Sequence, residues 1–174
     1  VVEAITACGY VEKQDFKTIK SHGFERIEMY DSGGILCTRT RSSKSGLGEG
    51  FDLLIIDEAQ EYTADQQSAL QYLVTSSANP QTIMCGTPPT AVSAGTVFPK
   101  YRRKTLSGEN ASAGWAEWSL PKMSDMSDRD LWYKTNPALG YTLTERIIAD
   151  EDCDDAVDAN IQRLGVWILY KHNS

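Results

Sequence analysis

The sequence predicts an α/β fold in which a parallel sheet is flanked by helices. Two short apolar runs, at residues 51–56 and 82–85, favour buried strands, and apolar side chains between them recur at helical spacing. A strand, a helix and a second strand in this order form a right-handed crossover between parallel neighbours. The composition fits a globular domain, because 41% of the 174 residues are hydrophobic and 24% are charged.

The N-terminal part of the chain is expected to form a β-hairpin. The apolar residues among the first 25 fit a helix or a strand equally well, so this segment has no clear assignment. Residues 26–30 alternate polar and apolar side chains, and residues 35–38 continue after an Asp-Ser-Gly-Gly interruption. The glycine pair of that interruption is expected to supply positive φ angles at the turn. The Gly- and Ser-rich residues 42–50 then predict a loop.

One longer helix and several shorter elements follow. Thr63 and Gln66 have the spacing of a capping box, and Asn79-Pro80 ends the helical pattern that begins there. Further along, the apolar residues predict one strand and three short helices: residues 115–120, 128–134, 144–148 and 155–164, in that order. The acidic residues of the last two helices are interpreted as a solvated face.

Charge and composition exclude several kinds of protein. The chain has 24 acidic and 17 basic residues and a net charge of −7, which argues against a protein that simply coats nucleic acid. No stretch approaches the ~18–20 consecutive apolar residues of a membrane span, and no export signal is visible, so a cytoplasmic protein without a membrane part is expected. The four cysteines lack C-x-x-C spacing, which argues against structural zinc.

Two acidic residues, Asp57 and Glu58, directly follow the first apolar strand. The carboxyl ends of parallel strands are where α/β proteins bind ligands, and acids beside apolar neighbours are costly without a function. In nucleotide hydrolysis, the first acid would hold Mg²⁺ through its hydration shell, and the second would orient and deprotonate the attacking water. The alternative is that Asp57 caps the next helix and that Glu58 is simply solvated.

A second candidate segment, Gly86-Thr87-Pro88-Pro89, follows the second apolar strand. The hydroxyl of Thr87 can contact a γ-phosphate or the attacking water, and Gly86 allows a close approach of the backbone. The alternative is a turn whose prolines end the strand. Because the two strands are expected to be neighbours, Asp57, Glu58 and Thr87 should converge on one nucleotide site.

The 174 residues contain no phosphate-binding loop. The glycines of residues 46–50 lead into a strand and have no lysine after them, and the pattern G-x-x-x-x-G-K-[S/T] occurs nowhere. Such a loop supplies the main contacts to a triphosphate, so the chain alone is expected to hydrolyse ATP poorly or not at all. Two basic clusters can contact phosphate groups or form plain solvated surface: Arg39, Arg41 and Lys44, and residues 100–104.

Several motifs occur in an order that resembles one protein family. They are Arg39-Thr40-Arg41-Ser42-Ser43 with the glycine-rich loop after it, Leu54 to Gln60, Gly86 to Pro89, Glu117-Trp118, Asn136 to Gly140 and Leu164 to Trp167. Together they resemble the ATPase half of the large terminase subunit of tailed bacteriophages, over residues 26–167. The Asp-Glu pair occurs in many nucleotide hydrolases, whereas its combination with Gly-Thr-Pro-Pro, Asn-Pro-Ala-Leu-Gly and Leu-Gly-Val-Trp is much more specific.

This resemblance implies a partial P-loop NTPase of the ASCE type with a C-terminal helical lid and linker segment, and ATP and Mg²⁺ as its cofactors. Asp57 would be the Walker B ligand of Mg²⁺, and Glu58 would be the catalytic base. Thr87 with Gly86 would form the coupling motif. The chain would divide into an unassigned segment, a partial ATPase core that lacks Walker A, and a lid and linker that lead towards a nuclease domain: residues 1–25, 26–120 and 121–174.

The same resemblance implies a function for the intact protein. It would hydrolyse ATP to move double-stranded DNA into a procapsid, as a ring of identical subunits that also carries an endonuclease. Its partners would be the portal protein and the small terminase subunit, in the cytoplasm of a bacterial host. Family members commonly have Arg-Gly where this chain has Leu47-Gly48, so the intersubunit arginine is not identified, and Arg39 or Arg41 would be a guess.

Two other interpretations stay open. Asp-Glu-Ala-Gln also occurs in helicases, so a helicase-like ATPase fragment is an alternative, although Gly86-Thr87-Pro88 is not the element expected in that case. The other alternative is a non-catalytic module that binds DNA or a capsid protein. The chain begins at Val1 without an initiator methionine, and it ends with Lys171-His172-Asn173-Ser174 directly after an apolar run, so a fragment of a longer phage or prophage protein is expected.

Overall fold

The computed structural model of the protein describes residues 1–21, 25–40, 50–151 and 155–168. The chain forms two compact units, Val1–Leu47 and Gly48–Ser174. Residues 42–49 of the predicted loop lie outside the described residues. The same holds for three positions singled out above: Arg41, Lys44 and Leu47-Gly48.

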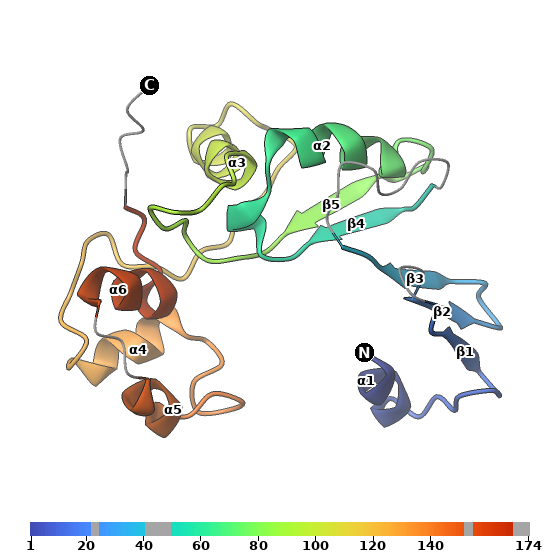
Figure 1. The fold of residues 1–174 in the computed structure, drawn as a ribbon, viewed down its shortest axis with the longest axis horizontal. Coiled ribbons are helices and arrows are strands. Elements are labelled where there is room, and N and C mark those ends of the chain that lie inside the picture. The colour runs from blue at the N-terminus through green and yellow to red at the C-terminus, as the bar shows by residue number, and fades with distance from the viewer. Residues whose placement is uncertain (22–24, 41–49, 152–154, 169–174) are drawn as a thin grey trace. The chain divides into compact units, whose positions relative to one another are not determined.

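The first unit contains a helix and a three-stranded antiparallel sheet (Figure 1). Its elements are α1 (Val2–Ala7), β1 (Phe16–Ile19), β2 (Glu25–Met29) and β3 (Ile35–Thr38). The strands lie in the order β1-β2-β3, and the fully buried Phe16 pairs with Met29. Residues on both sides of the predicted boundary between residues 25 and 26 therefore belong to one sheet.

The predicted hairpin is confirmed as the β2–β3 pair, in which Glu28 lies opposite Ile35. At its turn, Gly33 has a positive φ of 65°, as expected. The same expectation is wrong for Gly34. Its carbonyl accepts a hydrogen bond from the backbone N–H of Met29 (2.8 Å) and so continues the pairing of the strands.

The second unit begins with a strand, a helical connection and a strand, which confirms the predicted parallel pair. Strands β4 (Leu53–Ile56) and β5 (Gln81–Met84) run parallel, and the connection between them consists of η1 (Ala59–Glu61), α2 (Ala64–Leu70) and η2 (Gln71–Val74). The predicted capping box is present at the start of α2. The Thr63 hydroxyl accepts the backbone N–H of Gln66 (3.3 Å), and Gln66 Oε1 accepts the N–H of Thr63 (3.2 Å).

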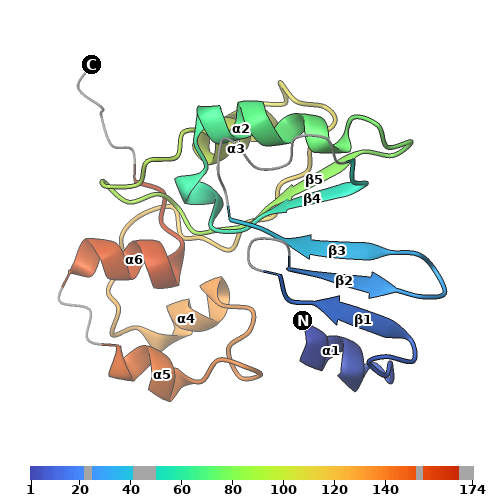
Figure 2. The same cartoon turned by 45° about the vertical axis from the view of Figure 1, so that its right-hand side comes forward.

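The β4–β5 sheet is covered on one face, where α2 and α3 (Val97–Leu106) pack (Figure 2). The buried residues of this core come from the sheet, the connection and α3: Ile56, Ala59, Tyr62, Leu70, Leu73, Val97 and Phe98. On the other face, Ile55 and Ile83 lie opposite each other and are 53% and 48% exposed. The strand predicted as buried at residues 51–56 is therefore covered on one face only in the described part of the chain, because both helices pack on the same side.

The C-terminal part of the second unit contains the three predicted short helices, α4 (Arg129–Thr135), α5 (Glu145–Asp150) and α6 (Ala156–Leu164). Their N-cap side chains each accept a backbone N–H of the first turn: Asp128, Thr144 and Asp155. The helices and the segments between them share a second core: Trp132, Leu139, Ile148, Leu164 and Val166. Each helix in the described ranges is too short or too polar to cross a membrane.

The strand predicted for residues 115–120 is wrong, since this segment pairs with no other strand in the described part of the chain. The backbone N–H of Leu120 donates to the carbonyl of Leu164 at the end of α6 (3.0 Å). The carboxylate of Glu117 accepts hydrogen bonds from Arg102 of α3. The segment is therefore held by contacts with two helices, α3 and α6.

Candidate functional site

The two candidate segments meet at the carboxyl ends of β4 and β5. Beyond the strands, the backbone N–H of Cys85 donates to the carbonyl of Ile56 (3.0 Å), and the N–H of Ala59 donates to the carbonyl of Cys85 (2.9 Å). These hydrogen bonds hold Asp57 and Glu58 beside the segment that follows β5. The segments that follow β4 and β5 are therefore neighbours, as expected, whereas the roles of the individual residues stay predictions.

Glu58 has an unusual backbone conformation. Its φ and ψ are both 50°, in the left-handed region that costs a residue with a side chain about 1–2 kcal/mol. The chain turns here from β4 into η1, whose first residue, Ala59, is fully buried. Strained positions of this kind concentrate at functional sites, where the surrounding structure holds them in place.

Asp57 is an exposed carboxylate at the end of β4. Its Oδ1 accepts the backbone N–H of Glu58 (3.0 Å) and the thiol of Cys85 (3.6 Å). Burial raises the pKa of the Cys85 thiol, and the negative charge of Asp57 raises this pKa further. The thiol therefore stays protonated at neutral pH and acts as a weak donor to Asp57.

The donors at this edge of the sheet fit a hydrated Mg²⁺ better than a metal held by the protein alone. Within the described residues, no cluster of three or more His, Cys, Asp and Glu side chains could hold a metal ion. Mg²⁺ usually keeps several water molecules and takes one or two carboxylates together with the phosphates of a nucleotide. The exposed carboxylate of Asp57 is suited to that kind of site.

Gln60 belongs to this site and was not singled out by the sequence interpretation. The residue is 8% exposed, and its Nε2 donates to Oε2 of Glu58. Its Oε1 accepts the backbone N–H of Thr87 (3.3 Å). The one signal in the sequence is that Gln60 is a polar residue directly after Ala59. This signal indicates a partner for Gln60 only once β5 is known to lie beside β4.

Gly86 lies where the segment after β5 comes close to Gln60. A Cβ atom on Gly86 would lie 2.3 Å from Oε1 of Gln60 and 2.8 Å from the backbone nitrogen of Ala59. No side chain fits at this position unless its neighbours move. The close backbone approach expected of Gly86 is present, and it is an approach to Gln60 and Ala59.

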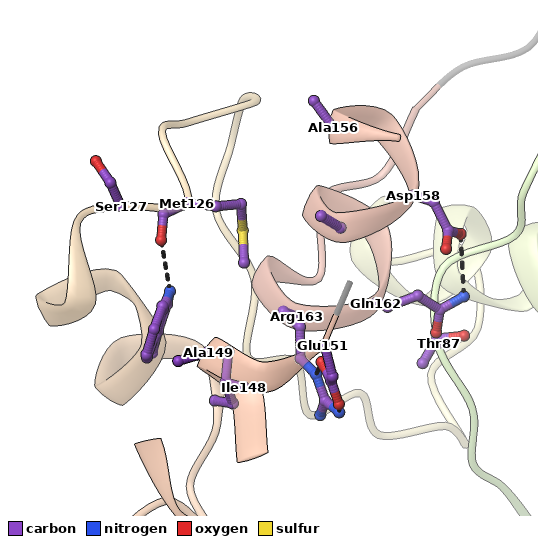
Figure 3. A pocket seen from close by; sticks show the side chains of 12 residues that line it. Thr87, Met126, Ser127, Ile148, Ala149, Glu151, Ala156, Asp158, Gln162 and Arg163 are labelled. Carbon is purple, nitrogen blue, oxygen red and sulfur yellow. Dashed lines mark hydrogen bonds and ion pairs between the residues drawn. The ribbon is translucent and has the colours of Figure 1, made fainter. Parts of the chain in front are cut away.

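Thr87 lies at the edge of a cavity of about 840 Å³ that is formed mainly by α4, α5 and α6. Figure 3 shows Thr87 beside Gln162 of α6, on one side of this cavity. Thr87 also lines a second cavity of about 440 Å³, between the end of β5 and the 114–118 segment. Neither Asp57 nor Glu58 lines either cavity. The structure thus brings the three residues to one edge of the sheet but not into one cavity.

The basic cluster at residues 100–104 is part of α3, and its Arg102 is engaged within the unit. The guanidinium makes two hydrogen bonds to Glu117 (2.6 and 2.9 Å) and lies 4.4 Å from the ring centre of Trp167. Arg102 therefore links helix α3 to two of the motifs on which the family resemblance rests, Glu117-Trp118 and Leu164 to Trp167. Lys100 and Arg103 are exposed and remain candidates for contacts with phosphate groups.

Glu117 is the carboxylate at the centre of this arrangement. Hydrogen bonds from Arg102, Ser119 and Trp115, of which that from Arg102 has the largest effect, hold its pKa at about 2, well below the ordinary value. The carboxylate is therefore ionised at neutral pH, and its hydrogen bonds fasten the 115–119 segment to α3.

No family model and no curated protein sequence matches the chain. Among solved structures, the crystal structure of the large terminase of bacteriophage HK97 is similar, with a TM-score of 0.66 at 18% sequence identity. The match covers 85% of this chain and 32% of that chain, so the chain spans about a third of the length of that terminase. The resemblance to a large terminase is thereby confirmed at the level of the fold.

Proposed function

We propose that this chain is part of the ATP-hydrolysing motor domain of a phage large terminase, of the P-loop NTPase type. The whole protein would use ATP and Mg²⁺ to drive double-stranded DNA into a procapsid. One observation carries the proposal: Asp57-Glu58 and Gly86-Thr87 meet at the carboxyl ends of two parallel strands, in a fold similar to that of the HK97 large terminase. Nucleotide hydrolysis needs a metal-binding acid and a base at such an edge.

Each residue has a defined part in the proposed reaction. Mg²⁺, bound together with the nucleotide, would neutralise charge on the phosphates. Asp57, as the Walker B acid, would hold the water molecules of that ion. Glu58 would accept a proton from the attacking water, with its carboxylate held by Gln60. Thr87, on the adjacent segment, would respond to the loss of the γ-phosphate.

The remaining parts of the motor belong to the same proposal. The phosphate loop would come from another part of the protein, because the 174 residues contain no G-x-x-x-x-G-K-[S/T] pattern. Residues 121–174 would act as a lid and linker towards an endonuclease domain. The ring of subunits, the portal protein and the small terminase subunit as partners, and the cytoplasm of a bacterial host are proposed for the whole protein.

The test is Glu58→Gln in the full-length protein, a change that removes the proton acceptor and keeps the shape of the side chain. We expect ATP hydrolysis and DNA packaging to fall by about 10²- to 10⁴-fold, the usual contribution of a general base, while DNA binding is retained. The matched control is Glu109→Gln, at an exposed position outside the site, which should keep the wild-type rates.

Two outcomes would overturn the proposal. Wild-type packaging by the Glu58→Gln variant would favour a non-catalytic module that binds DNA or a capsid protein. A loss of DNA unwinding, with packaging unaffected, would favour a helicase-like ATPase.

A further inference from the structure

Gln60 connects the two segments of the candidate site through one carboxamide. Its Nε2 donates to the carboxylate of Glu58, two positions earlier in the chain, and its Oε1 accepts the backbone N–H of Thr87 (3.3 Å). The same side chain therefore touches the proposed proton acceptor and the backbone of the neighbouring segment. A displacement of either partner changes a hydrogen bond of Gln60.

The orientation of this carboxamide follows from its partners. A backbone N–H can only donate, so the oxygen of Gln60 must face Thr87. The nitrogen then faces the carboxylate of Glu58, which accepts. The reversed amide would set donor against donor and acceptor against acceptor in a buried place, where unmade hydrogen bonds are costly. The amide thus has one favourable orientation.

The backbone around Gln60 leaves its side chain little freedom. A Cβ atom on Gly86 would lie 2.3 Å from its Oε1, and a Cβ atom on Gly95 would lie 2.2 Å from its backbone oxygen. The backbone N–H of Val97 donates to the carbonyl of Tyr62 (3.3 Å), which ties the end of η1 to the start of α3. Gln60 therefore lies in closely packed backbone, with the segment after β5 directly against its side chain.

We propose that Gln60 is a positioning residue that couples the carboxylate of Glu58 to the backbone at Thr87. It holds the proton acceptor in one place, and it transmits a displacement of the Thr87 segment to Glu58 when the γ-phosphate leaves. The inference rests on the proposed function, because it gives Gln60 a part in that same reaction. Gln60 acts through Glu58 and makes no contact with the reacting atoms.

Gln60→Met in the full-length protein tests the inference. Methionine has nearly the same length and shape, so the packing is kept, but it can neither donate to Glu58 nor accept from Thr87. We expect kcat for ATP hydrolysis to fall about 10- to 100-fold, as a misplaced catalytic group would cause. KM for ATP should change less than about twofold, because substrate binding is left intact. Gln71→Met, at an exposed position of η2, is the matched control and should change neither constant.

Two further variants separate positioning from folding. Gln60→Asn keeps the carboxamide but is one methylene shorter, so it can reach one partner at a time. It should lower kcat in the same way with a thermal unfolding midpoint near that of the wild type. Glu58→Gln combined with Gln60→Met should be no slower than Glu58→Gln alone in single-turnover hydrolysis, because residues that act as a unit are not additive.

The outcomes distinguish this inference from the function on which it rests. Wild-type kcat in both Gln60 variants, together with an inactive Glu58→Gln protein, would overturn the coupling and leave the proposed function standing. An additive loss in the double variant would also overturn it, since Gln60 would then act independently of Glu58. Wild-type hydrolysis by Glu58→Gln would overturn the proposed function and this inference with it.

Discussion

Gly86 shows how little space separates the segments that follow β4 and β5. A methyl group there would lie 2.3 Å from Oε1 of Gln60 and 2.8 Å from the backbone nitrogen of Ala59. The amide oxygen ends a side chain and can move aside, but the nitrogen belongs to the backbone of a fully buried residue. A substitution at Gly86 must therefore push the two segments apart.

Gly86→Ala is expected to lower the free energy of unfolding of the chain by about 1–3 kcal/mol, the usual cost of forcing atoms into filled space. Urea unfolding followed by circular dichroism measures this change. Gly114→Ala is the matched control, because a Cβ atom there meets no atom within 4 Å. Its effect should stay below about 0.5 kcal/mol. Equal losses in the two variants would contradict the crowding described for Gly86.

Glu117 makes the stability of the chain depend on pH in the acid range. Its pKa in the folded protein is about 2, because Arg102 holds the carboxylate, whereas a glutamate in an unfolded chain titrates near ~4.3. The unfolded state thus binds the proton more readily. The stabilisation is fully present above about pH 5 and is lost as the pH falls through about 2. Its size is on the order of 3 kcal/mol.

The Glu117→Gln variant lacks this contribution. We expect it to be less stable than the wild type at neutral pH and to lose less stability between about pH 5 and pH 2. Urea unfolding at a series of pH values gives the slope of the free energy of unfolding against pH for each protein. Glu109→Gln, whose position is exposed, should follow the wild type. Parallel slopes for Glu117→Gln and the wild type would show that the Arg102 pair contributes nothing.

Helix α6 is fastened to the loop before α4 by a buried amide. Asn160, 1% exposed, accepts the backbone N–H of Ser124 (2.8 Å). It donates to the carbonyls of Ser124 (3.1 Å) and Ala156 (2.9 Å). One side chain therefore satisfies backbone groups of two separate elements.

Asn160→Asp keeps the size and the acceptor but removes both N–H donors and sets a negative charge against two carbonyl oxygens. A loss of about 2–4 kcal/mol in the free energy of unfolding is expected, since the charge is buried and unpaired. Urea unfolding measures it, with Asn79→Asp at an exposed position as the control, within about 0.5 kcal/mol of the wild type. A wild-type unfolding curve for Asn160→Asp would mean that α6 is held in another way.

The elements that could be predicted are those whose signal is local. Strand β4 is a continuous apolar run, and β5 (Gln81–Met84) ends in two apolar residues. Helix α2 carries its capping box at its N-cap and in its first turn. Strand β1 could not be assigned, because Phe16 alone among its four residues is fully buried and the strand is defined by its pairing with β2. The strand expected at residues 115–120 is absent for a related reason. This segment pairs with no strand in the described part of the chain and is held by contacts with α3 and α6.

The residues of the candidate site likewise comprise those with a local signal in the sequence and one without. Asp57, Glu58, Gly86 and Thr87 could be selected from the sequence, because each follows an apolar run and parallel pairing brings the ends of such runs together. Gln60 could not, since its hydrogen bond to Thr87 joins residues 27 positions apart. A contact of that separation exists only after the chain has folded.

For the molecule as a whole, the proposed function requires a phosphate loop outside the 174 residues, which contain no G-x-x-x-x-G-K-[S/T] pattern. The purified chain at saturating Mg-ATP should release phosphate at less than about 1% of the rate of the full-length protein, because loss of the phosphate loop costs orders of magnitude. Steady-state phosphate release compares the two proteins directly. Equal rates would show that the chain holds the nucleotide by other groups.

Concentrated solutions of the chain should be prone to fibril formation. Ile55 and Ile83 are 53% and 48% exposed on the open face of the β4–β5 sheet, and within the described residues β4 and β5 pair only with each other. Unpaired strand edges beside exposed isoleucines are templates to which other extended chains add. Thioflavin fluorescence should therefore rise during storage, and Ile55→Lys should suppress the rise. A sample of the wild type that stays monodisperse for weeks would contradict this expectation.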